Sequence, residues 1–199
     1  MLGLESPSSG QLLIDGRSPH AEFSHFRGRM AAVFQTDRLL PWRNAVDNAR
    51  IAMQILKVPE PEQIRRAEYW LDNLGLGNFK RAFPHELSGE MRQRVALARA
   101  FALDPDVLFL DEAFGHLDEV TAARLRSDFV AVLSELRKTC IIVTHNIDEA
   151  VQTASRILVL GRPAQILRDI RLTEDQRFGH EAARLREEIF NLIETTSEH

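Results

Sequence analysis

The sequence predicts an α/β fold in which a parallel β-sheet core carries an inserted helical subdomain. Two observations support this class. Short apolar runs alternate along the chain with longer segments whose apolar residues recur at helical spacing. The run Val107–Leu110 is also continuously apolar, which is typical of a strand buried on both faces of a parallel sheet.

Five short apolar runs are interpreted as strands. The run Val107–Leu110 begins after the turn residues Asp104–Asp106, and the first run is followed by the turn pair Asp15–Gly16. The expected strands are Gln11–Ile14, Met30–Phe34, Val107–Leu110, Cys140–Thr144 and Ile157–Leu160.

Apolar residues at helical spacing predict several helices. One begins near Pro61 and ends at Gly75, because proline favours the first turn of a helix and glycine follows its end. A second begins at Ser88, a third has Asp118 as its N-cap, and a terminal helix begins at about Glu181. The predicted apolar faces are Ile64, Ala67, Leu71 and Leu74; Val95, Ala98 and Ala102; Leu125, Phe129, Val132 and Leu136; and Leu185, Ile189 and Leu192.

We expect the 199 residues to form a single domain, because this length and 44% hydrophobic content are enough for one sizeable core. Residues 1–35 and 88–170 are the expected α/β core, residues 36–87 the helical subdomain, and residues 171–199 a C-terminal helical tail.

Composition narrows the function classes. A net charge of -4 gives no electrostatic reason to expect nucleic-acid binding. The single cysteine, Cys140, excludes an intrachain disulfide and suits a reducing cytosol, where we expect it to pack inside. No apolar run approaches the roughly 18 residues of a membrane span, and the N-terminus lacks the features of a signal peptide. We therefore expect a soluble chain.

Asp111 and Glu112 follow the central strand, where parallel sheets bind ligands in the crevice outside their carboxyl ends. In phosphoryl-transfer enzymes the first acid of such a pair holds Mg²⁺, and the second orients or deprotonates the attacking water. That chemistry also requires a phosphate-binding loop, G-x-x-x-x-G-K-[ST]. The sequence contains no such loop, because no glycine precedes any of its lysines, Lys57, Lys80 and Lys138.

The most specific stretch is LSGEMRQRVALARAF, from Leu87 to Phe101. Ser88 and Gly89 stand at a helix start, where a hydroxyl and free backbone N–H groups can receive an anion. This stretch, followed in order by Val107–Glu112, Asp118 and His145, resembles the nucleotide-binding subunits of ABC transporters. The resemblance implies a P-loop NTPase-like fold.

The resemblance runs from Met1 to about Arg168, and the stretch LLPWR at Leu39–Arg43 is similar to the nitrate, sulfonate and taurine importer branch. It implies ATP and Mg²⁺ as cofactors, with Gln35 reaching the metal and the water and coupling the site to a membrane partner. The resemblance also implies that Asp111 is a magnesium ligand, that Glu112 is the catalytic base and that His145 is the switch histidine near the γ-phosphate. It further implies that Ser88, Gly89 and Asp118 bind nucleotide. Of these, Ser88 and Gly89 would contact the ATP of the opposite subunit.

Partners follow from the same resemblance. The helical subdomain, with Trp42 and the helices up to about Gly75, would receive a coupling helix of an integral membrane permease. A second nucleotide-binding subunit would complete a homodimer or heterodimer, and a periplasmic or extracellular solute-binding protein would act indirectly. The implied function is ATP hydrolysis coupled to uptake of a nitrate-, sulfonate- or taurine-like solute, at the cytoplasmic face of the cell membrane.

Several residues also have purely structural interpretations. Ser88 is interpreted alternatively as an N-cap, worth about 1 kcal/mol, and His145 as a packed or capping histidine. Asp118 is expected to cap a helix in any event, and Trp42 is interpreted alternatively as a core aromatic of the helical subdomain.

The alternative function is a truncated, non-catalytic subunit that lends Ser88 and Gly89 to an intact partner while binding a permease. A soluble ABC protein of translation or DNA repair is disfavoured, because the sequence has no duplicated domain, coiled-coil insert or basic stretch.

The sequence departs from the family pattern at several positions. Glu90 stands where the signature usually has a second glycine, and its charge is expected to lie near an incoming γ-phosphate. Ala113 replaces the usual proline, and His116 the usual alanine. The first ten residues are similar to the end of the helix that follows a phosphate loop. We therefore expect an N-terminally truncated chain, with the loop encoded upstream within about 10 to 15 residues.

Overall fold

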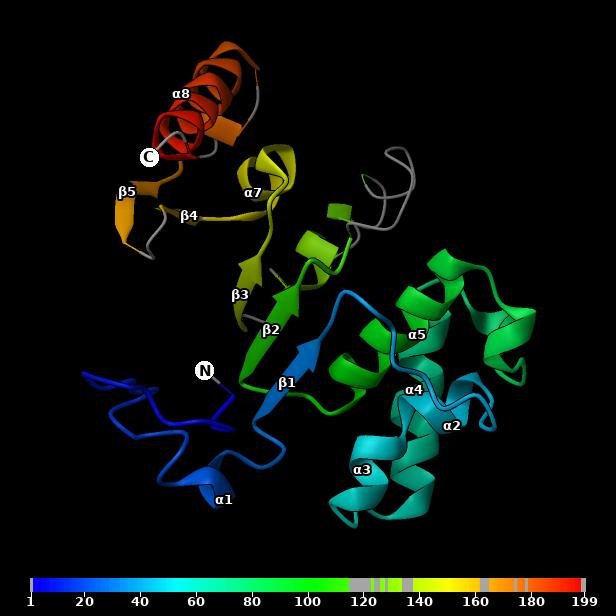
Figure 1. Ribbon diagram of the computed structural model, residues 1–199. Coiled ribbons are helices and arrows are strands. Elements are labelled where there is room, and N and C mark those ends of the chain that lie inside the picture. The colour runs from blue at the N-terminus through cyan, green and yellow to red at the C-terminus, as the bar shows by residue number, and fades with distance from the viewer. Residues whose placement is uncertain are drawn as a thin grey trace.

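The computed structural model describes residues 2–114, 123, 126–127, 129–133, 138–161, 165–173, 175–177 and 179–197. A three-stranded parallel sheet lies between a group of helices on one side and a two-stranded antiparallel sheet with a long helix on the other (Figure 1). The α/β class with a parallel sheet is confirmed.

The parallel sheet has the order β1-β2-β3. Its strands are β1 (Met30–Val33), β2 (Val107–Asp111) and β3 (Thr139–Val143), and Val107 pairs with Met30 on one side and Thr139 on the other. Because all three strands are parallel, their carboxyl ends meet at one edge. The central strand β2 buries most of its apolar side chains, as its continuous apolar run predicts.

Helices fill the chain between β1 and β2. They are α2 (Ala45–Ala49), α3 (Ile51–Ile55), α4 (Glu60–Asn73) and α5 (Gly89–Ala102), with the 3-10 turns η1 (Gly77–Phe79) and η2 (Pro84–Glu86).

Helix α4 has the predicted ends, with Pro61 in its first turn and Gly75 at a φ of 75° just beyond its last residue. Ala67, Leu71 and Leu74 of the predicted apolar face are buried, whereas Ile64 is 37% exposed. Its neighbour Gln63 is buried instead and donates to Val58 O at 2.6 Å.

The main core joins β1 and β2 to α2, α4 and α5. The ring of Trp70 on α4 stacks on Phe101 of α5 with centroids 4.8 Å apart. Phe129 contacts Phe101 and Phe114, at centroid distances of 5.8 and 5.6 Å. Such pairs add about 0.5–1.5 kcal/mol to the free energy of area burial. Phe129 and Val132 lie in helical residues and pack on this core, as predicted, whereas Asp118, Leu125 and Leu136 lie outside the described residues.

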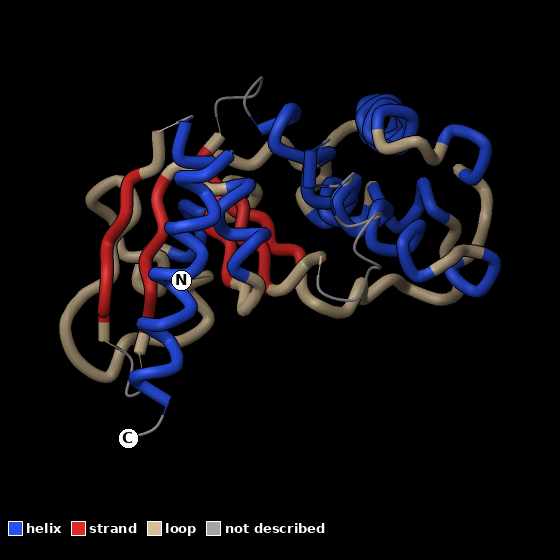
Figure 2. Tube along the Cα trace, turned by 90° about the horizontal axis from the view of Figure 1, so that it is seen from above, coloured by secondary structure: helices blue, strands red, loops and turns tan. Residues whose placement is uncertain are grey.

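A second core lies towards the C-terminus. It is formed by helix α7 (Ile147–Thr153), β4 (Arg156–Leu160), β5 (Ile166–Arg171) and α8 (Gly179–Ser197). The turn η3 (Asp175–Arg177) precedes α8. Ala182, Leu185 and Ile189 of α8 pack into this cluster. Figure 2 shows the hairpin strands and this helix together at one end of the molecule.

Strand β5 was not expected from the sequence, because its residues ILRDIR lack a continuous apolar run. It pairs antiparallel with β4, where Ile157 faces Ile170 and Arg156 holds Asp169 through two contacts of 2.8 and 2.7 Å. The β5 segment therefore forms a strand because it pairs with β4, although most of its side chains are exposed.

The predicted strand at Gln11–Ile14 is wrong. Ile14 forms an isolated bridge with Arg17 across the turn at Asp15 and Gly16, and a short helix, α1 (Phe23–Phe26), follows. Within the described chain no neighbouring strand pairs with this run, so its apolar pattern produces a local turn and not a sheet member.

Among the described residues, no helix is both long enough and apolar enough to cross a bilayer.

Candidate functional site

The candidate site lies at the carboxyl edge of the parallel sheet. Gln35 stands two residues after β1, Asp111 is the last residue of β2 and Glu112 follows it. His145 stands two residues after β3. The parallel register therefore brings together residues that are 77 and 33 positions apart in the sequence.

The carboxylate of Glu112 is the centre of this site. Gln35 Nε2 donates to Glu112 Oε2 at 2.8 Å, and His145 Nδ1 lies 2.9 Å from Glu112 Oε1. Because an ionised carboxylate only accepts hydrogen bonds, the histidine ring is the donor in this contact. The His145 side chain is 75% exposed and accessible to a ligand.

The backbone of Glu112 is strained. Its φ of 47° lies in the left-handed region, which non-glycine residues rarely adopt, and its N–H donates to Val143 O at 2.9 Å. Such conformations cost about 1–3 kcal/mol and cluster at functional sites. The hydrogen bond to the end of β3 holds Glu112 in the position where its carboxylate reaches both neighbours.

Helix α5 fixes the turn that follows Gln35. Arg99 donates to the backbone oxygens of Arg38 and Asp37 at 3.0 and 2.7 Å, and Arg92 Nε donates to the Asp37 carboxylate at 2.9 Å. Burial lowers the pKa of Arg99, and the charge of Asp37 opposes this shift.

Gln93, which is buried, connects the same helix to the strand ends. Its Nε2 donates to Ala113 O at 2.8 Å and contacts Phe34 O at 3.4 Å. One side chain therefore links the residues that follow β1 to those that follow β2.

Ser88 and Gly89 begin α5, as predicted. The Ser88 hydroxyl accepts the N–H of Met91 at 3.1 Å, so its interpretation as an N-cap is confirmed. The structure does not bring these two residues into the hydrogen-bonded cluster around Glu112, and their contact with nucleotide stays a prediction. Asp118 lies outside the described residues.

Trp42 is 71% exposed, so its interpretation as a core aromatic is wrong. The reason is the buried side chain of Asn48, which donates to Leu40 O and Arg43 O at 3.1 and 2.8 Å. Its Oδ1 also accepts the Leu40 N–H at 2.7 Å. These bonds fix the turn on either side of Trp42, whose ring then projects into solvent.

Side-chain oxygen atoms at the carboxyl edge of the sheet are suitable ligands for Mg²⁺. The ion binds to proteins through one or two carboxylates and completes its shell with water and phosphate. Asp111 offers an exposed carboxylate, and Gln35 keeps its amide oxygen free because its Nε2 serves Glu112. Asp111 and Gln35 therefore fit the ion. Among the described residues, no group of three or more His, Cys, Asp or Glu side chains forms a metal cage.

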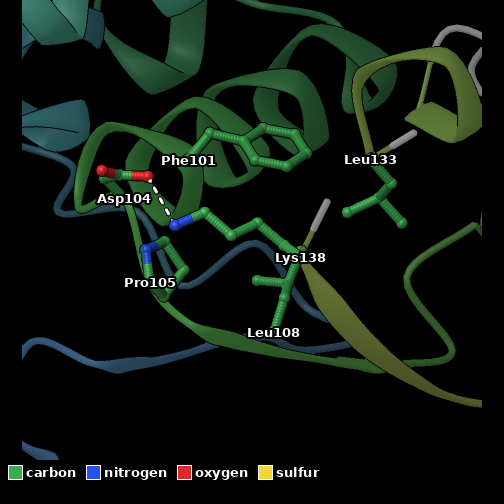
Figure 3. A pocket seen from close by; sticks show the side chains of 6 residues that line it. All are labelled: Phe101, Asp104, Pro105, Leu108, Leu133 and Lys138. Carbon is green, nitrogen blue, oxygen red and sulfur yellow. Dashed lines mark ion pairs between the residues drawn. The ribbon is translucent and has the colours of Figure 1, made fainter. Parts of the chain in front are cut away.

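A small hollow at the opposite end of β2 has different chemistry. Lys138 and Asp104 form an ion pair of 3.0 Å beside the apolar side chains of Phe101, Leu108 and Leu133 (Figure 3). It contains none of the residues predicted to bind nucleotide, and we do not assign it to the site. Nearby, burial raises the pKa of the Cys140 thiol to about 12, which favours the protonated, less nucleophilic form of this half-buried cysteine.

Sequence reasoning missed the residues that hold the site together. The Arg-Gln-Arg run after the signature marks Arg92 and Gln93 but does not show that they reach the residues following β1. No sequence signal identifies Asn48 and Glu149 as buried polar groups, because an isolated Asn or Glu in a helix is usually exposed.

The fold is that of an α/β domain of the P-loop NTPase type, as in ABC ATPases. The family described as ABC transporter matches residues 1–115, and the chain belongs to this family.

The chain is 36% identical to the taurine import ATP-binding protein TauB of Rhizobium johnstonii, over 96% of this chain and 76% of that protein. It is 38% identical to the nitrate import ATP-binding protein NrtD of Synechocystis sp., over 84% of this chain and 62% of that protein. Among solved structures, it is similar to a dimeric ATP-binding cassette in a post-hydrolysis state with ADP and Pi. That match has a TM-score of 0.75 and 29% identity, over 86% of this chain and 77% of the other.

Proposed function

We propose that this chain is the ATP-binding subunit of an importer for a nitrate-, sulfonate- or taurine-like solute. The observation that carries the proposal is the placement of Glu112 between Gln35 and His145, directly after Asp111. The similarity to taurine and nitrate import proteins supports the solute class.

In the proposed reaction, Asp111 and the amide oxygen of Gln35 would hold Mg²⁺, which would neutralise charge on the nucleotide phosphates when bound. Glu112 accepts a proton from the attacking water, and the exposed imidazole of His145 donates a ring N–H to the γ-phosphate region. A general base of this kind contributes roughly 10²–10⁴-fold to rate. Gln35 keeps the Glu112 carboxylate oriented through its 2.8 Å hydrogen bond.

The proposed assembly has two nucleotide-binding subunits and a membrane permease. Ser88, Gly89 and Asp118 contact the nucleotide, with Ser88 and Gly89 reaching that of the opposite subunit. Residues 36–87 act as a helical subdomain that binds the permease near the exposed Trp42. The chain then works at the cytoplasmic face of the cell membrane, and a separate solute-binding protein delivers the solute.

A second candidate function is a non-catalytic subunit that lends Ser88 and Gly89 to a partner's nucleotide. It is favoured by one observation, namely that Ser88 and Gly89 begin α5 outside the hydrogen-bonded cluster around Glu112.

Binding of Mg-ATP by the purified chain distinguishes the two candidates. A fluorescent ATP analogue is titrated into the chain with Mg²⁺ and with excess EDTA, and the Asp111→Asn variant is the control. Magnesium-dependent binding that Asp111→Asn weakens supports the catalytic subunit. Absence of binding by the chain alone, with binding restored by an intact partner subunit, supports the second candidate.

A further inference from the structure

Glu149 is a buried acid that the proposed mechanism does not use. It lies in α7 and is 1% exposed, and among the described residues it is the one buried carboxylate. Burying a carboxylate is costly unless hydrogen bonds or opposite charge compensate it. Burial raises the pKa of Glu149, and the hydrogen bond from Thr144 and the charge of Arg126 oppose the shift. Packing alone therefore does not explain why a glutamate is buried at position 149.

Hydrogen bonds connect Glu149 to the turn that carries His145. The Thr144 hydroxyl donates to Glu149 Oε2 at 2.9 Å and accepts the Asn146 N–H at 3.0 Å. The Asn146 side chain in turn accepts the Glu149 N–H at 3.0 Å. These three bonds form a closed ring that includes the residue on each side of His145.

His145 depends on this ring for its position. Its side chain is 75% exposed, and the hydrogen bond described for it is the contact with Glu112 at 2.9 Å. Little packing therefore restrains the imidazole, and its direction is set by the backbone of residues 144–146. Since the ring fixes that backbone between β3 and α7, it also fixes where the imidazole can reach.

Capping of α7 does not explain why residue 149 carries a carboxylate. Asn146 already supplies the N-cap by accepting the Glu149 backbone N–H, which needs no acidic side chain at position 149. Another hydroxyl on the same helix, that of Thr153, contacts the Glu149 carbonyl at 2.6 Å and lies outside the ring. It offers a matched comparison.

We propose that Glu149 is a positioning residue, which acts through Thr144 and Asn146 to hold the His145 imidazole against Glu112. The inference rests on the proposed function, which gives His145 and Glu112 their chemical roles. Glu149 itself does not touch the nucleotide. Its effect is to keep the histidine turn in one conformation before the nucleotide arrives.

The first test needs no nucleotide. His145 ring signals are assigned by NMR in the purified chain with the help of His145→Gln, and the NOE between the His145 ring and the Glu112 side chain is measured. Thr144→Val and Glu149→Ala break the ring, and we expect each to lower the equilibrium constant for the His145–Glu112 contact by on the order of fivefold, as for loss of one net hydrogen bond, and so to weaken this NOE. Thr144→Ser keeps the hydroxyl and should retain the parent signal.

Thr153→Val is the matched control. It removes a hydroxyl bonded to the backbone of the same glutamate and should leave the His145 ring signals unchanged. Equal NOE losses in Thr153→Val and Thr144→Val, or an unchanged NOE in Thr144→Val and Glu149→Ala, would overturn the proposal. If either ring-breaking variant fails to fold, the conservative Glu149→Gln and Thr144→Ser are compared with the parent instead. A weakened NOE in Thr144→Ser would then also contradict the proposal.

The second test measures ATP turnover in the assembled transporter. Thr144→Val should lower kcat by on the order of fivefold with KM within twofold of the parent, whereas Thr153→Val should change neither. Equal changes in kcat for the two variants would overturn the positioning role. If the parent assembly hydrolyses no ATP at this chain's Glu112, the proposed function fails, and the NMR comparison still decides the role of Glu149.

Discussion

Glu90 and Arg94 form an ion pair one turn apart on α5, with Arg94 Nη2 2.6 Å and Arg94 Nε 2.8 Å from Glu90 Oε1. Arg94 also donates to Leu74 O at 3.0 Å, which joins this pair to the end of α4. The acid that departs from the usual signature is therefore neutralised within its own helix, and its effect on a nearby phosphate is smaller than the sequence alone predicts.

Replacing Glu90 should have two effects. Glu90→Gly leaves Arg94 without its partner, so the helix start becomes more positive and ATP-driven dimerisation should tighten. The effect should be larger near 10 mM salt, where screening is weak over about 30 Å. The same change should lower the free energy of unfolding by about 1 kcal/mol through helix propensity and the lost pair. Sedimentation and urea unfolding measure the two effects, with Glu90→Gln as control, and an unchanged dimer affinity at both salt concentrations would contradict the first.

Glu112→Gln should keep nucleotide binding and lower ATP turnover in the assembled transporter by roughly 10²-fold or more, because it removes the proposed general base. Asp111→Asn should instead weaken the magnesium dependence of binding. Steady-state ATPase rates and magnesium titrations separate the two variants. Turnover of Glu112→Gln within a fewfold of the parent would rule out the base assignment.

Trp42 and Trp70 should respond oppositely to replacement by alanine. Trp42 is 71% exposed, so Trp42→Ala should change the free energy of unfolding by less than about 0.5 kcal/mol and yet weaken binding to the permease. Trp70 stacks on Phe101, and Trp70→Ala should cost about 3 kcal/mol. Urea unfolding and co-purification with the permease are the measurements. Full permease binding by Trp42→Ala would argue against the proposed docking region.

Asn48→Ala should destabilise the chain by about 2–3 kcal/mol, because the half-buried Leu40 N–H and Arg43 carbonyl lose the Asn48 side chain as their partner, whereas Leu40 O still accepts the Arg43 N–H. The exposed Asn73, whose amide donates to Tyr69 O, provides a control, and Asn73→Ala should cost less than about 1 kcal/mol. Thermal and urea unfolding compare the two variants. Equal losses of stability would show that the Asn48 network adds no more than an exposed amide does.

The stability contributed by Glu149 should depend on pH. Its pKa is raised above the ordinary value of 4.5, mainly by burial. A raised carboxyl pKa means that folding favours the protonated form, so this contribution is present below about pH 4.5 and is lost as pH rises through the folded pKa. Glu149→Gln cannot ionise. Its free energy of unfolding, relative to the parent, should therefore increase between pH 4 and 8 in urea titrations, and a constant or falling difference would refute the shift.

The sequence by itself was sufficient for the elements with strong local signals. The apolar run of β2 predicts a buried parallel strand, and the proline and glycine near the ends of α4 mark a helix. Ser88 is readable as a cap because its hydroxyl serves a backbone group three residues away. Local sequence was not sufficient to predict strand β5, and it wrongly predicted a strand at Gln11–Ile14. The reason is that a strand exists only where another strand pairs with it.

For the candidate site too, the sequence predicted some features and the tertiary structure decided others. Motif order was enough to select Gln35, Glu112 and His145, but only the parallel register of β1, β2 and β3 placed them within hydrogen-bonding distance of one another. The exposure of Trp42 and the burial of Asn48 and Glu149 were likewise decided by tertiary structure. The physical reason is that local propensity acts over a few residues, whereas burial and side-chain hydrogen bonds depend on which distant segments the folded chain brings together.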